Sequence, residues 1–232
     1  YKLAIPSVIA HGGAGPGPSR QENLEVAINK ASEILVAGGN AIDAAVQACM
    51  ILEDDPVFNA GTGSVMRTDG SVLTDASIQT SDGKIGFVIA MEDTPNPILV
   101  AADLLNEEIN GLTSEGARMW ADNNGHIKRK VIGVPPKGQI GDTNKQITGD
   151  TVGVITRDTT GMIVVATSTG GCSFRPPGRV GDVPLPGSGF WAEEGLAVAA
   201  TGIGEAITRA LLSYKVFEKI KVGKYSLEES MN

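Results

Sequence analysis

The chain has 232 residues and a net charge of −8 at pH 7, so it lacks the basic face that nucleic acid or an anionic membrane requires. We therefore expect a small soluble substrate, and the absence of both a signal-peptide pattern in residues 1–11 and an apolar run of about 18 residues predicts a cytoplasmic protein. With two histidines and two cysteines, there is little material for a zinc site or a Ser-His-Asp triad, and Cys49 and Cys172 are predicted to be free thiols.

Apolar periodicity and turn residues predict a sequence of short strands and helices. The second helix is expected to be capped by the Asn40 side chain and to pack closely through a stripe of small residues. Turns are expected at Asp69-Gly70 and Asp82-Gly83. In chain order, the predicted elements are a strand (7–10), a helix ending at Gly38-Gly39, a helix from Asn40 to Leu52, strands (64–68, 71–75, 84–90), helices (97–105, 113–122), strands (151–156, 162–168, 196–201) and a helix (204–218). Because no strand-helix-strand unit repeats, this order predicts a layered α+β fold.

Residues 123–149 break this pattern. They are polar, include Pro135-Pro136 and five glycines, and show no apolar period. A loop of this length inside a compact domain is usually disordered or functional, and it ends abruptly at Thr151, where a buried strand is predicted. The interpretation is an N-terminal part, 1–150, that includes a flexible linker over 123–150, and a C-terminal part, 151–232.

Threonines with glycine neighbours form the pattern that points to chemistry. They are Thr151, Thr169 and Thr201. A threonine at a chain terminus carries its own base, because its free α-amine has a reference pKa of about 7.7 to 8.0. Cleavage between Asp150 and Thr151 would create such a terminus. The alternative is that these threonines are ordinary strand residues, and His11 is expected to have a structural role.

Several motifs in register resemble one family, the plant-type asparaginases and isoaspartyl aminopeptidases, which are threonine N-terminal-nucleophile hydrolases. The similarity covers essentially the whole chain. The motifs are His11-Gly12-Gly13-Ala14-Gly15, Phe58-Asn59-Ala60-Gly61, Gly149-Asp150-Thr151-Val152-Gly153, Thr167-Ser168-Thr169-Gly170-Gly171, Pro177-Gly178-Arg179-Val180-Gly181-Asp182 and Thr201-Gly202-Ile203-Gly204-Glu205.

The resemblance implies a catalytic role for four residues. Thr151 would first act as the nucleophile that cleaves the peptide bond between Asp150 and Thr151, and would then be the nucleophile of catalysis. Thr169 would hydrogen-bond the hydroxyl of Thr151. The Thr201 hydroxyl and the Gly202 N–H would form the oxyanion hole. The implied reaction is hydrolysis of L-asparagine to aspartate and ammonia, or of β-aspartyl (isoaspartyl) dipeptides.

Substrate and ion binding are also implied. Arg179 would bind the substrate α-carboxylate through its planar guanidinium, and Asp182 with the Gly204 carbonyl would hold the α-ammonium. No cofactor is expected for catalysis. A structural sodium ion would be held by backbone carbonyls of Leu52, Glu53, Asp55, Phe58, Ala60 and Thr62.

At the level of the fold, the resemblance implies a four-layer αββα sandwich that forms one structural domain after cleavage and self-associates as a dimer of cleaved alpha-beta units. The 82 residues from Thr151 to Asn232 are expected to lack the last strands of the family. Asp150 is typical of the glycosylasparaginase and taspase branches, so a glycosylasparaginase and a taspase-like endopeptidase stay open as alternatives. An uncleaved, non-catalytic homologue is the third.

Overall fold

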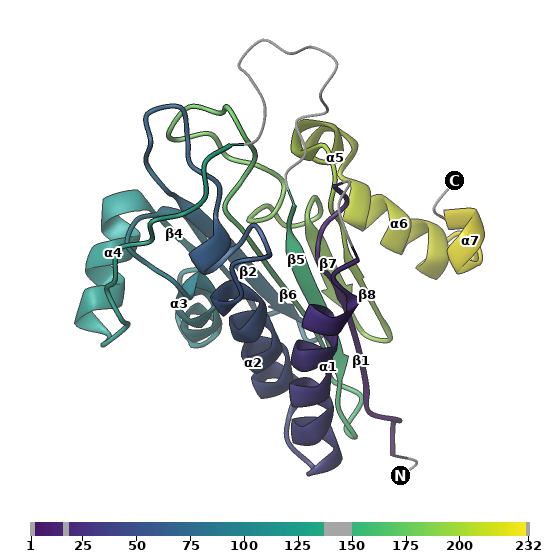
Figure 1. The fold of residues 1–232 in the computed structure, drawn as a ribbon. Helices are drawn as coiled ribbons and strands as arrows, with labels where there is room; N and C mark the ends of the chain where they lie inside the picture. The colour runs from purple at the N-terminus through teal and green to yellow at the C-terminus, as the bar shows by residue number, and fades with distance from the viewer. Residues whose placement is uncertain (1–2, 16–18, 137–149, 231–232) are drawn as a thin grey trace.

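The computed structural model describes residues 3–15, 19–136 and 150–230. Helices and strands occur in both parts of the chain (Figure 1). The elements are β1 (Ser7–His11), α1 (Gln21–Val36), α2 (Ala41–Asp54), η1 (Gly61–Gly63), β2 (Thr74–Thr80), β3 (Ile85–Met91), α3 (Pro97–Asp103), η2 (Leu104–Asn106), β4 (Gly111–Thr113), α4 (Ser114–Asn123), β5 (Val152–Arg157), β6 (Ile163–Thr169), β7 (Phe190–Glu193), β8 (Leu196–Ala199), α5 (Gly204–Ala210), α6 (Leu212–Lys221) and α7 (Leu227–Ser230).

A six-stranded sheet organises the molecule, with the strand order β1-β5-β6-β2-β3-β4. Its neighbours pair antiparallel, except that β4 pairs parallel with β3. Every residue of the central strands β2 and β6 is buried, which shows that both faces of the sheet are covered at its centre. The predicted α+β class is confirmed by this mixture of a largely antiparallel sheet with separate helices.

Helices α1, α2 and α3 cover one face of the sheet (Figure 1). The side chain of Asn40 accepts a hydrogen bond of 2.8 Å from the Asp43 N–H, as the sequence predicts. The predicted stripe of small residues is fully buried. Its alanines let α2 lie close to β5, which begins directly after Thr151, and to β6, which ends at Thr169. The stripe consists of Ala41, Ala44, Ala45, Ala48 and Leu52.

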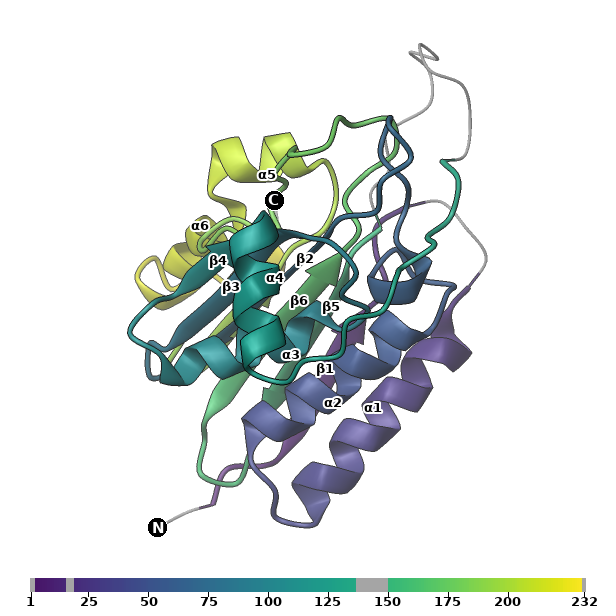
Figure 2. The ribbon, with the colours of Figure 1, turned by 90° about the vertical axis from the view of Figure 1, so that its left-hand side faces the viewer.

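The opposite face of the sheet is covered by the two-stranded sheet β7-β8, which contacts β6. Phe190 and Ala192 of β7 pack with Val165 of β6 in a second apolar cluster. Helix α6 packs on β7 and β8, so helices lie on both sides of the main sheet (Figure 2). The loop between β6 and β7 therefore lies where the two sheets meet, and it carries Arg179 and Asp182.

Some predicted elements differ from the structure. Residues 64–68 and 71–73 are not strands, although the Asp69-Gly70 turn forms and the Arg67 N–H donates to the Ser71 carbonyl at 2.8 Å. The predicted helix over 204–218 is broken at Leu211, which has a φ of 49°.

The predicted linker lies partly outside the described residues. In the described part, Val134 exchanges two hydrogen bonds of 2.9 Å with Ser64 and Met66, so this stretch is attached to the fold. The prediction of a flexible linker also covers residues 137–149, which lie outside the residues that the structure describes.

Two bulk predictions can be compared with the described residues. Cys49 and Cys172 are both free and buried, as expected. Over residues 3–15, 19–136 and 150–230, no helix combines the length and apolar character needed to cross a bilayer.

Candidate active site

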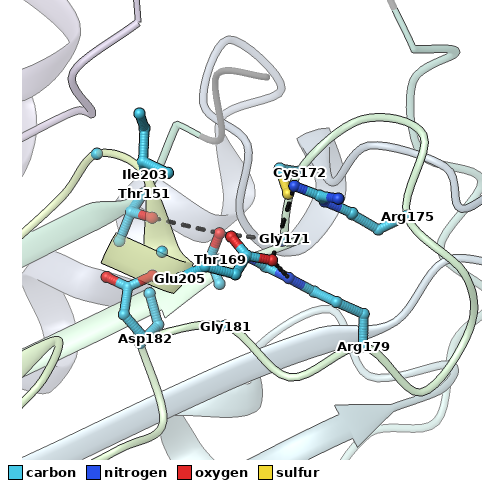
Figure 3. A pocket seen from close by; sticks show the side chains of 13 residues that line it. Thr151, Thr169, Gly171, Cys172, Arg175, Arg179, Gly181, Asp182, Ile203 and Glu205 are labelled. Atoms are coloured by element: carbon cyan, nitrogen blue, oxygen red, sulfur yellow. Dashed lines mark hydrogen bonds and ion pairs between the residues drawn. The ribbon is translucent and has the colours of Figure 1, made fainter. Parts of the chain in front are cut away.

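Thr151 and Thr169 meet at one end of the main sheet. Because β5 and β6 are antiparallel, with Val152 opposite Ser168, the start of one strand lies beside the end of the other. The Thr151 hydroxyl donates to the Thr169 hydroxyl at 3.4 Å, and both residues are buried (Figure 3). The pairing register thus brings together two threonines that are 18 positions apart in the chain.

The Thr169 hydroxyl is the centre of a small hydrogen-bond network. It accepts the Gly171 N–H at 3.0 Å and donates to the main-chain carbonyl of Asp150 at 3.2 Å. That carbonyl belongs to the Asp150–Thr151 peptide bond. Thr169 is therefore placed to polarise this carbonyl and to stay close to the Thr151 hydroxyl.

Asn59 supports the turn that follows Thr169. Its Nδ2 donates to the Gly171 carbonyl at 2.5 Å, its own carbonyl accepts the Gly170 N–H at 3.0 Å, and its Oδ1 accepts the Val65 N–H at 2.9 Å. The predicted motif around Asn59 and the Thr-Gly-Gly motif are therefore joined in space, although they are more than 100 residues apart.

Arg179 and Glu205 form a two-point ion pair at the other end of the pocket. The guanidinium Nε donates to Glu205 Oε1 at 3.2 Å, and Nη2 donates to Oε2 at 3.0 Å. Arg175 also approaches Oε1, at 3.7 Å. Burial is the largest single influence on the pKa of Arg179 and acts to lower it, but the hydrogen bond with Glu205 and the nearby charges of Glu205, Asp182 and Cys172 together raise this pKa above its usual value. Glu205 thus keeps Arg179 charged and directed along the pocket wall.

Asp182 presents a buried carboxylate to the same pocket. Its Oδ2 has no hydrogen-bond partner among the described residues, and burial raises the pKa of the carboxyl group above its ordinary value. A Cβ added to Gly204 would stand 2.6 Å from Asp182 Oδ1 and 2.7 Å from Arg179 Nη2. The absence of a side chain at Gly204 therefore leaves room for both charged groups.

These side chains line one pocket, which combines hydroxyl groups, guanidinium groups and carboxylates (Figure 3). Six of the predicted catalytic and substrate-binding residues line it together. Thr201 is not among the lining residues, and its Oγ1 is buried without a hydrogen-bond partner in the described part of the chain. The lining consists of Thr151, Thr169, Gly171, Cys172, Arg175, Arg179, Gly181, Asp182, Val183, Gly202, Ile203, Gly204 and Glu205.

The structure adds charged groups to the predicted site. Glu205 stands in one of the recognised motifs, and Arg175 lies four residues before Arg179, yet neither was assigned a role. The signals available were the charge of Arg175 in a glycine- and proline-rich loop and the charge of Glu205 in the first turn of α5. Which carboxylate Arg179 contacts depends on how this loop folds, and the sequence does not show that.

A second layer of charge lies behind Thr169. Asp75 is opposite Thr169 in the register of β2 and β6, and burial raises the pKa of Asp75 to about 6. Arg67 is also buried, next to Gly171, and burial lowers the pKa of Arg67 while the nearby Asp75 opposes that shift. Burial lowers the pKa of His11 to about 4, so the ring is neutral at pH 7.

Backbone carbonyls approach two glycines, Gly61 and Gly63, in the loop after α2. A Cβ at Gly61 would stand 2.5 Å from the Glu53 carbonyl oxygen, and a Cβ at Gly63 would stand 2.6 Å from that of Pro56 and would also collide with that of Phe58. Carbonyl oxygens are suitable ligands for a hard cation. Among the described residues, no cluster of three or more His, Cys, Asp or Glu residues could hold a metal ion.

The threonine pair and the charged pocket on this α+β fold are compatible with a hydrolase. The chain matches the family described as "Asparaginase" over residues 4–131 and 128–232. It belongs to this asparaginase family.

Curated relatives agree with the assignment. An isoaspartyl peptidase/L-asparaginase from Bos taurus is 37% identical over 98% of this chain and 80% of the relative. The protein of the same name from Homo sapiens is 36% identical over 97% of the chain and 80% of the relative. A plant-type L-asparaginase from Pyrococcus horikoshii is 31% identical over 94% of the chain and 80% of the relative.

Proposed function

We propose that this protein is a self-cleaving threonine amidohydrolase that acts on L-asparagine and on β-aspartyl dipeptides. The observation that carries the proposal is the network at the start of β5. The Thr151 hydroxyl lies 3.4 Å from the Thr169 hydroxyl, which in turn hydrogen-bonds the carbonyl of the bond to be cut. The names of the relatives supply the substrate class.

Self-cleavage would proceed through an ester. Thr151 Oγ1 attacks the carbonyl carbon of Asp150, the carbon–nitrogen bond breaks, and the nitrogen takes up a proton to become the α-amine of Thr151. Water then hydrolyses the ester, which releases the Thr151 hydroxyl and leaves a carboxylate on Asp150. Thr169 supports the first step because its hydroxyl donates to the carbonyl oxygen, where negative charge develops.

Amide hydrolysis would then use the new terminus. The α-amine of Thr151 accepts the proton of its own hydroxyl as Oγ1 attacks the side-chain amide carbon of the substrate. Ammonia, or the amine of a dipeptide, leaves with a proton, and water hydrolyses the acyl-enzyme to release aspartate. The Gly202 N–H and the Thr201 hydroxyl would stabilise the oxyanion. The free Thr201 Oγ1 supports this role because it has no competing partner in the described structure.

Substrate recognition would rest on Arg179 and Asp182. Glu205 holds Nε and Nη2 of Arg179, so Nη1 is available for the substrate α-carboxylate. The carboxylate of Asp182, with the Gly204 carbonyl, would bind the α-ammonium. This ammonium would favour the charged form of Asp182, whose pKa is raised by burial even though the nearby charge of Arg179 acts to lower it.

We also propose four features of the wider molecule. The sheets β1-β5-β6-β2-β3-β4 and β7-β8, with their helices, would belong to a four-layer αββα sandwich. Two cleaved units would associate as a dimer, and the protein would act in the cytoplasm. The carbonyls of Leu52, Glu53, Asp55, Phe58, Ala60 and Thr62 would hold a sodium ion, supported by the close approach of the Glu53 and Phe58 carbonyls to Gly61 and Gly63. This ion would make the loop that carries Asn59 more rigid and would take no part in the chemical steps.

The decisive experiment compares the wild-type chain with Thr151→Ala. After incubation, the wild type should give fragments 1–150 and 151–232 by mass spectrometry and should release ammonia from L-asparagine. The variant should remain one band on a denaturing gel and be inactive, whereas Thr208→Ala on α5, a control change of the same type, should behave as wild type.

The proposal would be wrong if Thr151→Ala were still cut at this bond or still released ammonia. A wild-type chain that stays intact would favour the non-catalytic homologue. Cleavage combined with activity only on glycosylasparagine or on a protein would favour the glycosylasparaginase or taspase-like alternative.

A further inference from the structure

The side chain of Asp150, the residue before the proposed cleavage bond, is held on both of its oxygens. Oδ2 accepts Arg20 Nη1 at 2.9 Å, and Oδ1 accepts the Gly15 N–H at 2.9 Å. The two side chains of the ion pair are only about one-fifth exposed, at 20% for Arg20 and 19% for Asp150. A charge-assisted bond together with a main-chain bond restricts this carboxylate far more than a surface ion pair would.

Arg20 is itself fixed in place. Its Nη1 also donates to the Gly12 carbonyl at 3.1 Å, and its guanidinium carbon lies 5.8 Å from the centre of the Phe58 ring. Because Phe58 is buried, the ring offers a rigid surface for the cation. Arg20 is therefore a preformed contact for Asp150.

The glycine-rich turn is shaped around the same carboxylate. A Cβ at Gly13 would stand 2.6 Å from Asp150 Oδ1, and one at Gly15 would overlap the same atom. Gly13 also has a φ of 108°, a backbone conformation that residues other than glycine rarely adopt. The turn can approach Asp150 only because these two positions carry no side chain.

Asp150 is thus held at two separate points. Its carboxylate is bound by Arg20 and Gly15, and its main-chain carbonyl is bound by Thr169 at 3.2 Å. Two anchors on opposite sides of one Cα limit rotation about the bond between Cα and the carbonyl carbon. They therefore fix the face of the carbonyl that is presented to Thr151 Oγ1.

We propose that Arg20 is a positioning residue for self-cleavage, acting through its ion pair with Asp150 to orient the carbonyl carbon toward Thr151 Oγ1. The inference rests on the self-cleavage proposed above. Arg20 contacts no atom of the bond that breaks and is not among the residues that line the pocket. Arg20 would act before the carbon–oxygen bond forms, by keeping the Asp150 carbonyl carbon in the orientation that Thr151 Oγ1 attacks.

The test measures the rate of cleavage at Asp150–Thr151 in freshly purified chains by mass spectrometry. Arg20→Met keeps an aliphatic side chain on Phe58 but removes the charge, and we expect about tenfold slower cleavage or worse. Arg20→Lys keeps a cation and should recover part of the rate. The exposed Arg209 on α5 provides a matched control, because Arg209→Met should cleave as the wild type does.

A double-mutant cycle separates positioning from a general loss of structure. Asp150→Asn keeps an oxygen for the Gly15 N–H but removes the negative charge. If Arg20 acts through Asp150, Arg20→Met combined with Asp150→Asn should be no slower than the slower single variant. Thermal unfolding of each variant in a Thr151→Ala background reports stability independently of cleavage.

The outcomes distinguish this inference from the proposed function. A wild-type chain that cleaves while Arg20→Met cleaves equally fast overturns the role of Arg20 and leaves self-cleavage intact. Effects that multiply in the double variant, or a Lys variant of unchanged stability that cleaves as slowly as Met, also overturn it. A wild-type chain that never cleaves at this bond overturns the proposed function, and this inference with it.

Discussion

Glu53 is a carboxylic acid in the interior of the protein, at the end of α2. Its side chain is fully buried, and Oε1 accepts the Ile98 N–H at 3.1 Å. Burial raises the pKa of this carboxyl group to about 8, because the charged form loses its hydration. Glu53 is therefore protonated in the folded protein at neutral pH, immediately before the loop that carries Asn59.

We predict that this residue makes stability fall with rising pH. The raised pKa means that the unfolded chain loses the Glu53 proton from about pH 4.5, whereas the folded chain keeps it until about pH 8. The free energy of unfolding should thus decrease by about 1.4 kcal/mol per pH unit within that window, and level off above it. Asp75 and His11, whose folded pKa values are about 6 and about 4, also titrate near or below the lower end of pH 6.5–8, so their contribution is removed by comparing two chains that both contain them.

The measurement is urea unfolding of Glu53→Gln and of its parent between pH 6.5 and 8. Both should carry Thr151→Ala, so that a single chain unfolds. The amide cannot ionise, so the variant should gain about 2 kcal/mol relative to its parent across this range. Parallel pH curves for the two proteins would show that Glu53 ionises normally in the folded state.

For single residues, the sequence motifs predict which residues form the pocket better than they predict which side chains contact one another. Thr151, Thr169, Arg179 and Asp182 do line one pocket, because the recognised motifs follow strand ends and loops that meet in space. The role of Glu205 was not predictable, because it depends on the folded path of the loop from residue 170 to 189. The contact between Arg20 and Asp150 spans 130 positions, and no local pattern indicates it.

Helix α5 begins at Gly204, where the helix terminus touches the pocket. A Cβ there would stand within 2.7 Å of both Arg179 Nη2 and Asp182 Oδ1, so these side chains would have to move. We predict that Gly204→Ala raises KM for L-asparagine and lowers kcat/KM by at least about tenfold. Alanine favours a helix over glycine by about 1 kcal/mol, so the unfolding temperature should not fall substantially.

Gly116 in α4 provides the matched control. An added Cβ there meets nothing within 4 Å, so Gly116→Ala should raise stability by about 1 kcal/mol and leave the kinetic constants unchanged. Steady-state kinetics and thermal unfolding of the two variants test both statements. Equal kinetics for the Gly204 and Gly116 variants would contradict a tight fit at the start of α5.

At the scale of elements, the long periodic segments were predictable, and of the short strands β1 and β8 were expected whereas β4 and β7 were not. The helices α1 and α2 and the strands β5 and β6 follow their apolar patterns. The strands β4 and β7 have three and four residues, too few to show a period, and they form because a neighbouring strand pairs with them. The hairpin predicted before β2 fails because residues 64–68 pair instead with the segment around Val134 and with the loop carrying Arg175.

The main sheet alternates between the two parts of the chain. Its order β1-β5-β6-β2-β3-β4 places two strands of the C-terminal part, β5 and β6, between β1 and β2 of the N-terminal part. Strand β1 forms a register of five residue pairs with β5, and β2 forms one of six with β6. The predicted division at residue 150 is therefore not a boundary between separately packed units, even though it coincides with the proposed cut.

We predict that cleavage at Asp150–Thr151 leaves the fold intact. The backbone hydrogen bonds of β1 to β5 and of β2 to β6 join the fragments, and α2 packs on both β5 and β6, so separation would expose the fully buried faces of these strands. The cleaved wild type should elute from a sizing column at the same volume as uncleaved Thr151→Ala, while a denaturing gel shows two bands. Fragment 151–232 produced alone should be unfolded by circular dichroism, because β5 and β6 would have open edges and no helix cover. Two separate peaks on the sizing column, or a cooperatively folded 151–232 fragment, would contradict a sheet in which each part completes the other.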